Sequence, residues 1–169
     1  MDASALRALQ APIKDKYRTA PDSAVITLKA KGTLDDTKIA CKVETGRALA
    51  EAGLHPATGG SGAELCSGDM LLEALVACAG VTLKAVATAL EIPLRAGTVS
   101  AEGDLDFRGT LGVDKEAPVG FRSIRLFFEL DTDAPEDKLA QLLKLTERYC
   151  VVFQTLNHKP ELSVATTTT

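Results

Sequence analysis

One stretch of the chain, residues 67–90, is apolar around nearly its whole circumference when it is drawn as a helix. It contains no proline, and the charged residues Asp69, Glu73 and Lys84 interrupt its apolar run. A helix that is apolar on all sides is a buried helix, and a charge in the middle of a bilayer is costly. The pattern therefore predicts a core helix of a soluble protein, with the rest of the chain packed around it.

Alternation of apolar and polar residues predicts strands on both sides of this helix. Before it, residues 23–31 and 39–43 are expected to form a hairpin across a turn at residues 32–36. After it, residues 99–107 and 121–130 alternate in the same way, with Asp106 on the polar side. These segments predict an antiparallel sheet with one wet face.

A second helix is predicted near the C-terminal end. Asp133 and Glu136 have the spacing of a capping box, with Pro135 in the first turn. The apolar face that follows continues without interruption through Cys150 to Phe153. The second helix is therefore expected to pack on the same core as the first.

The order of the elements predicts an α+β fold in which an antiparallel sheet packs on helices, because strands and helices do not alternate regularly. A short strand at residues 161–165 is expected to close the chain. Residues 2–18 form an amphipathic pattern in which Pro12 limits the helix. We expect residues 1–20 to be an N-terminal helical extension and residues 21–169 to be a single domain.

The composition fits one soluble domain: 46% of residues are hydrophobic, 25% are charged, and the net charge is -4. The sequence has no basic cluster that would follow a phosphate backbone, so nucleic acid is not an expected partner. The first twenty residues lack the apolar core of a secretory signal. We therefore expect a cytosolic protein with reduced thiols, no membrane association and no cofactor.

The loop before the long helix, residues 46–68, is rich in glycine. Ser67 is the expected N-cap, with Asp69 in the first turn. The glycine pattern lacks the Lys-Ser/Thr of a P-loop and the spacing of a dinucleotide motif, so it predicts a turn rather than a phosphate site. Cys66, beside the cap, is the thiol best placed for activation by the helix dipole.

The candidate reactive groups are the four cysteines, Cys41, Cys66, Cys78 and Cys150. There is no C-x-x-C, and the spacings do not match a zinc site. Cys41 alternates with polar residues and is expected to be a small core residue. A catalytic Cys-His pair would need His55 or His158, whose surroundings in the sequence do not favour it. For Cys78 and Cys150 two interpretations stay open, a pair of redox thiols or two buried inert cysteines.

Two segments resemble motifs of the OsmC/Ohr family. Residues 68–80, GDMLLEALVACAG, resemble the central-helix motif, in which an acidic residue, a Leu-rich turn and small residues precede a cysteine. Residues 147–156, ERYCVVFQTL, resemble the helix of the second cysteine. The resemblance covers residues 24–165 and implies an OsmC-like fold, with an antiparallel sheet packed on a long buried central helix, in an intertwined homodimer.

The resemblance also implies a thiol peroxidase that reduces organic hydroperoxides. Cys78 would be the peroxidatic thiolate that becomes a sulfenic acid, and Cys150 the resolving thiol that forms a disulfide with it. An external dithiol of the lipoyl or thioredoxin type would then reduce this disulfide. Because Asp69 and Cys78 point to opposite sides of one helix, Asp69 is expected to serve the partner's site or to hold an arginine there.

Three residue positions depart from the family pattern. Family peroxidases use an arginine of the early hairpin to stabilise the thiolate, but the turn at residues 32–36 contains none. Arg47 and Arg18 are substitutes between which the sequence does not choose. Asp69 stands where Glu is usual and has a shorter reach. Val151 follows the second cysteine where Pro is common, so the sequence does not predict the helix kink that exposes the resolving sulfur.

The missing hairpin arginine keeps other functions open. One alternative is a non-peroxidase protein of the same fold whose apolar pocket at the dimer interface binds a small hydrophobic ligand. Another is a structural, stress-associated dimer in which both thiols are unreactive.

Overall fold

The computed structural model describes residues 3–34, 41–43, 52–63 and 65–166. The helices of these residues are α1 (Ala3–Thr19), α2 (Ser67–Ala89), α3 (Phe107–Thr110), α4 (Glu136–Tyr149) and α5 (Val151–Asn157). The strands are β1 (Val25–Leu34), β2 (Cys41–Val43), β3 (Ala52–Gly53), β4 (Leu65–Cys66), β5 (Ala96–Asp106) and β6 (Phe121–Asp131).

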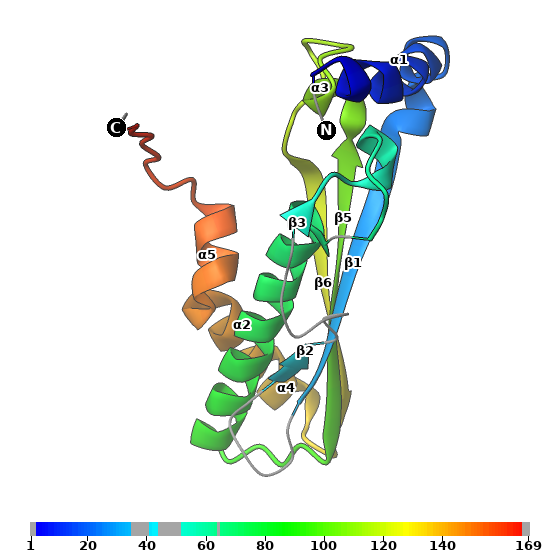
Figure 1. Cartoon of the computed structure of the whole chain (residues 1–169). Helices are drawn as coiled ribbons and strands as arrows, with labels where there is room; N and C mark the ends of the chain where they lie inside the picture. Colours follow the sequence, from blue (N-terminus) through cyan, green and yellow to red (C-terminus); the bar gives the residue numbers. More distant parts are fainter. Residues whose placement is uncertain (1–2, 35–40, 44–51, 64, 167–169) are drawn as a thin grey trace.

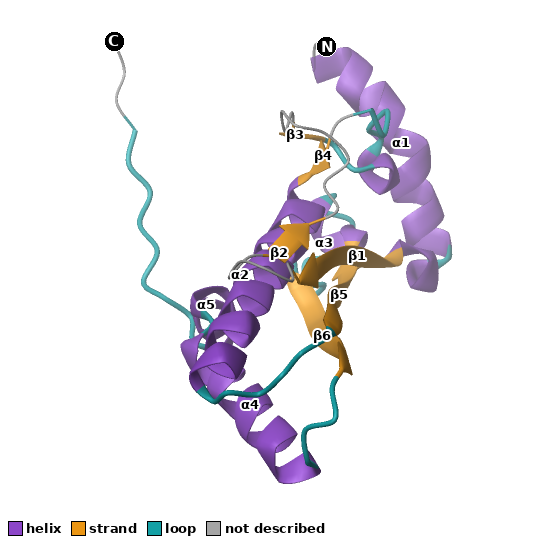
Figure 2. Cartoon of the chain, turned by 90° about the horizontal axis from the view of Figure 1, so that it is seen from below, coloured by secondary structure: helices purple, strands orange, loops and turns teal. Residues whose placement is uncertain are grey.

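Four strands form one antiparallel sheet in the order β2-β1-β5-β6. α2 runs along one face of this sheet (Figure 1), and α4 and α5 lie on the same side as α2 (Figure 2). β3 and β4 form a small parallel pair from which the chain passes directly into α2. The α+β class and the antiparallel sheet packed on a long central helix are therefore confirmed.

α2 packs on the sheet through one face. Its buried residues recur at helical spacing and are Leu72, Leu75, Val76, Ala79, Gly80, Leu83 and Ala87. All of them except Gly80 belong to one core with Val99 and Ala101 of β5 and Leu142 of α4, and these last three residues have no exposed surface. Burying a large aliphatic side chain stabilises the fold by about 1.5–3 kcal/mol, so this face holds the helix in one orientation.

The opposite face of α2 is open in the single chain. Leu71 and Val81 are 37% and 39% exposed, whereas Cys78, at the border of this face, packs against the core. The apolar pattern predicts burial around the whole circumference of α2. This prediction is wrong for the single chain, because the sheet covers only one side of the helix. α2 has the length and hydropathy of a membrane span, but its apolar inner face packs on protein.

α1 packs at one end of the sheet through a second, smaller core (Figure 1). Tyr17 is 3% exposed and contacts the core formed with Phe107 and Leu111. Its hydroxyl also donates to the carbonyl of Ala57 at 2.8 Å. The helix runs through Pro12, so this proline does not limit it as the sequence predicts.

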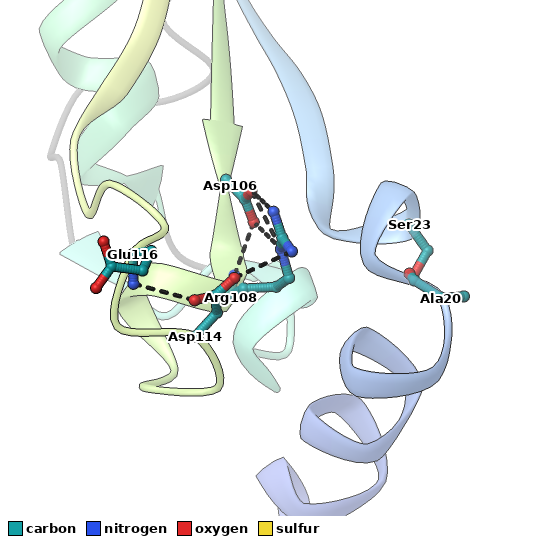
Figure 3. Close-up of polar contacts among 6 residues, drawn as sticks. All are labelled: Ala20, Ser23, Asp106, Arg108, Asp114 and Glu116. Carbon is teal, nitrogen blue, oxygen red and sulfur yellow. Dashed lines mark hydrogen bonds and ion pairs between the residues drawn. The ribbon is translucent and has the colours of Figure 1, made fainter.

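A buried ion pair borders this small core (Figure 3). Asp106, 2% exposed, accepts from the backbone N–H of Arg108 at 3.1 Å and from its guanidinium at 2.6 Å. The Arg108 guanidinium holds the pKa of Asp106 below its usual range. The prediction that Asp106 lies on the wet face and that Phe107 continues the strand is wrong, because the Asp106 carboxylate caps α3 at this point.

Two boundaries near α2 also differ from the prediction. β1 continues to Leu34, past the start of the predicted turn at 32–36, because its residues pair with β5 as far as Thr33. Cys66, rather than Ser67, is the N-cap of α2, and it makes no side-chain capping bond. The pairing of β4 with β3 keeps the chain extended through Cys66 and so delays the helix by one residue.

Two features of the chain after β6 also differ from the prediction. Asp133 does not cap α4, because its carboxylate pairs with Arg95 and Pro135 takes the N-cap position. Residues 161–165 form no strand but continue an extended tail that leaves the body of the chain (Figure 1). Leu162 in this tail is 78% exposed. A strand needs a neighbouring strand, and the described part of the chain offers none beside this segment.

Leu83→Ala is expected to lower the free energy of unfolding by about 2–5 kcal/mol, because it leaves a cavity beneath α2. Urea denaturation followed by circular dichroism measures the change. Leu162→Ala is the matched control, and its effect should stay within about 0.5 kcal/mol because this side chain lies in solvent. Equal effects of the two substitutions would contradict the assignment of α2 as the core helix.

Candidate functional site

α2, α4 and α5 bring Cys78 and Cys150 together. Cys78 lies in the middle of α2 and is half-buried, whereas Cys150 lies between α4 and α5 and has no exposed surface. Both are free thiols, and their sulfurs are within hydrogen-bonding reach of each other. The two helix faces that hold the cysteines thus meet in one core.

Cys150 marks a break between two helices. With φ −71° and ψ 107° it is the C-cap of α4 and the N-cap of α5. Its backbone N–H closes α4 on the carbonyl of Thr146 at 2.9 Å, and its Sγ accepts the N–H of Phe153 at 3.5 Å. The uninterrupted helix that the sequence predicts is therefore wrong. The kink forms without proline because the sulfur itself caps the second helix.

Uncharged donors surround the sulfur of Cys78. Burial is the largest single influence and raises the pKa of this thiol. Hydrogen bonds from the Val152 amide, the Cys150 thiol, the Val151 amide and the Thr82 hydroxyl together outweigh it, and the pKa falls below its ordinary value. Donors of this kind favour the thiolate over the thiol.

The pKa of Cys150 is shifted in the opposite direction. Burial raises its pKa to about 11, although the amide of Phe153 acts to lower it, and the neighbouring Cys78 raises it as well. Of the two thiols, Cys78 is therefore the one whose pKa is lowered and Cys150 the one whose pKa is raised. This division agrees with the roles that the family resemblance implies for the two residues.

Asp69 lies in the first turn of α2, more than two turns from Cys78. Burial raises the pKa of Asp69, and His55 acts to lower it. The pKa of Glu73, one turn further on, is also raised, first by burial and then by Asp69. Asp69 therefore belongs to an acidic group near His55, and the structure does not bring it to the Cys78 of its own chain.

The two histidines do not form a pair with either thiol among the described residues. His55 accepts the N–H of Ala57 at Nδ1, at 3.0 Å, and its ring stacks on Phe107 with the centroids 4.9 Å apart. His158 is exposed at the C-terminal end of α5. A Cys-His catalytic pair is therefore not supported.

The arginine of the site is not identified by the structure. Arg47 lies outside the described residues. Arg18 pairs with Asp15 at 2.6 Å on the exposed surface of α1. Within the described part of the chain, the groups with the largest influence on the pKa of Cys78 are uncharged.

The other two cysteines lie apart from the pair. Cys66 is the half-buried N-cap of α2, and the side chain of Cys41 is outside the description. Among the described residues, no group of three or more His, Cys, Asp or Glu side chains could hold a metal ion.

A groove of about 520 Å³ opens one helical turn from Cys78. Leu71 and Leu75 of α2 line it, and they precede Cys78 by about two turns and one turn of the helix. The other walls come from β6 and α5, with Phe121, Arg122, Ile124, Leu126, Phe153 and Leu156 among their residues. The arrangement places a mainly apolar groove one helical turn from Cys78.

Sequence reasoning missed three donors to Cys78. Thr82 follows Cys78 by one helical turn, so helical spacing was a signal for it. The amides of Val151 and Val152 point at the sulfur only because the helix breaks at Cys150. A backbone amide donates whatever its side chain is, so the residue types do not reveal these donors. The apolar pattern continues through Cys150 and therefore does not indicate the break.

A family model for OsmC-like proteins matches residues 59–165 of the chain. Among solved structures, an OsmC-like hydroperoxide resistance protein from Jannaschia sp. CCS1 superposes with a TM-score of 0.59 at 16% identity. The alignment covers 85% of this chain and 97% of that one, and at this identity the likeness concerns the fold. No curated protein matches the chain.

Val151→Pro is expected to raise the pKa of Cys78, because it removes one amide donor. Proline fits the first position of a helix and needs an extended residue before it, which Cys150 provides. The rate of Cys78 alkylation by iodoacetamide follows the thiolate fraction, so its half-maximum should move to higher pH.

Val151→Ala is the matched control, because it removes the same 70% exposed side chain and keeps the N–H. Its alkylation profile should equal that of the unsubstituted protein. A proline variant with an unshifted profile would show that this amide does not stabilise the thiolate.

Proposed function

Because the chain belongs to the OsmC-like protein family, we propose that it is a thiol-dependent peroxidase that reduces organic hydroperoxides. The observation that best supports this function is the pair Cys78 and Cys150, in which one thiol is held below its ordinary pKa while the other donates to it. The name of the structural relative, a hydroperoxide resistance protein, is consistent with the same role.

The first step is an attack of the Cys78 thiolate on the hydroperoxide. A sulfur–oxygen bond forms and the O–O bond breaks, so Cys78 becomes a sulfenic acid. The alkoxide leaves as an alcohol after taking one proton. A lowered pKa increases the fraction of Cys78 present as the thiolate, the form that this step needs, and the apolar groove beside it suits an apolar substituent on the peroxide.

The second step joins the two cysteines. Cys150, as a thiolate, attacks the sulfur of the sulfenic acid; an S–S bond forms, the S–O bond breaks and hydroxide leaves as water. The amide of Phe153 already donates to the Cys150 sulfur at 3.5 Å and would stabilise that thiolate. An external dithiol of the lipoyl or thioredoxin type then reduces the disulfide.

We also propose that the protein is a homodimer with its site near the subunit interface. Three apolar side chains near Cys78 are exposed in the single chain: Leu71 by 37%, Val81 by 39% and Val151 by 70%. Apolar residues grouped in this way suit a protein partner. In this dimer, Asp69 and one of the arginines Arg47 and Arg18 would act on the site of the partner subunit. Sedimentation that gives the 17.8 kDa of a single chain would contradict the dimer.

The groove supports one alternative function. The groove is mainly apolar, as a binding site for a small hydrophobic ligand would be. Neither sulfur lines it. For such a binding function the cysteines would be dispensable, and the cysteine variants described below test this.

Cys78→Ser is expected to reduce the turnover of cumene hydroperoxide by at least about a hundredfold, because the nucleophile is lost. Cys150→Ser should consume one equivalent of peroxide and stop, because the sulfenic acid has no resolving thiol. A colorimetric peroxide assay with excess dithiol measures both variants.

Cys66→Ser is the control, because Ser is a favoured N-cap residue and Cys66 takes no part in the pair. Its turnover should match that of the unsubstituted protein. If Cys78→Ser retained normal turnover, the peroxidase function would be excluded and ligand binding would become the leading function.

A further inference from the structure

The first turn of α5 is held by the two sulfurs of the pair. The first amides of a helix have no carbonyl partner within the helix. In α5 the amides of Val151 and Val152 donate to the sulfur of Cys78. The amide of Phe153 donates to the sulfur of Cys150 at 3.5 Å. The beginning of this helix is thus satisfied by two side chains whose charge and bonding change in redox chemistry.

α5 depends on these contacts because it is short. It has seven residues, and a helix of this length is marginal in water without support from its surroundings. No residue of α5 is fully buried, and its support from the core comes through Val152 and Phe153. A loss of acceptors at the first turn is therefore expected to loosen the rest of the helix as well.

α5 also forms one wall of the groove. Phe153, Leu156 and Asn157 line the groove on this side. The side chain of Leu156 is 38% exposed, so packing holds the second half of α5 only weakly. A change in the order of α5 therefore changes the shape of the groove.

Oxidation of the pair changes the acceptors at the first turn. Each thiol loses one electron and one proton, and an S–S bond forms between Cys78 and Cys150. The hydroperoxide takes up the two electrons and two protons and becomes an alcohol and water. A disulfide sulfur carries no charge and accepts hydrogen bonds poorly, whereas a thiolate accepts them strongly. The amides of the first turn thus lose their best acceptor.

We propose that the Cys78–Cys150 pair is a redox switch for α5: the reduced pair orders the helix and with it one wall of the groove, and the disulfide loosens both. The disulfide ties Cys150 to α2, but this tie supplies no acceptor for the amides that follow Cys150. In the catalytic cycle, where the inference rests on the proposed function, the groove relaxes after each oxidation and the alcohol product leaves more readily.

The test uses the full chain with Cys66→Ser and compares its reduced form with its disulfide form. Diamide makes the disulfide, which keeps the test independent of peroxidase activity, and peptide mapping identifies the joined cysteines. Amide hydrogen exchange followed by NMR gives a rate for each residue of α5, and the amides of α4 are the internal reference. Both forms are measured at one pH above the half-maximum of Cys78 alkylation, because exchange itself depends on pH.

We expect the amides of Val151, Val152 and Phe153 to exchange at least about tenfold faster in the disulfide form, while the amides of α4 keep their rates. A second variant separates the two sulfurs. Cys78→Ala, kept reduced, should accelerate Val151 and Val152 at least about threefold more than Phe153, whose acceptor is the other sulfur.

Four results would each overturn the inference. They are equal or slower exchange of α5 in the disulfide form, equal acceleration of α4 and α5, equal acceleration of the three amides by Cys78→Ala, and failure of diamide to join Cys78 to Cys150. Failure of the peroxidase function would be seen separately, as a disulfide that forms with diamide but not with a hydroperoxide.

Discussion

The packing of α2 on the sheet is the constraint on which the candidate site depends. The inner face of the helix is buried against β5 and α4, so the helix cannot rotate without exposing large aliphatic side chains. Cys78 is thereby held on the side of α2 that contacts α5, within reach of Cys150. The same packing puts Asp69 at the far end of the helix, beside His55 and Glu73.

A second constraint is the break at Cys150. If the chain continued as one helix, the amides of Val151 and Val152 would bond to carbonyls of the preceding turn. The break frees them, and they donate to the Cys78 sulfur instead. One cysteine thus shapes the backbone that lowers the pKa of the other. Backbone donors held in a packed core favour the thiolate over the thiol without a cation.

The sequence predicts the long helices and the central strands because their apolar periodicity is strong and their packing follows from it. It fails where a local pattern is overridden by a contact that no pattern encodes. Asp106 alternates like an exposed strand residue, but Arg108 neutralises it and allows burial. Residues 161–165 have the pattern of a strand but no described strand beside them. The pairing of Cys78 with Cys150 could be predicted only as one of two alternatives, because proximity depends on how α4 and α5 return to α2.

The most direct test of the account is the intact mass of the reduced protein after one equivalent of cumene hydroperoxide, followed by peptide mapping. The account predicts a rapid loss of the mass of two hydrogen atoms and a disulfide that joins Cys78 to Cys150. An unchanged mass, or oxidation confined to Cys66, would contradict it and would mean that the chain has the fold of the family without its thiol chemistry.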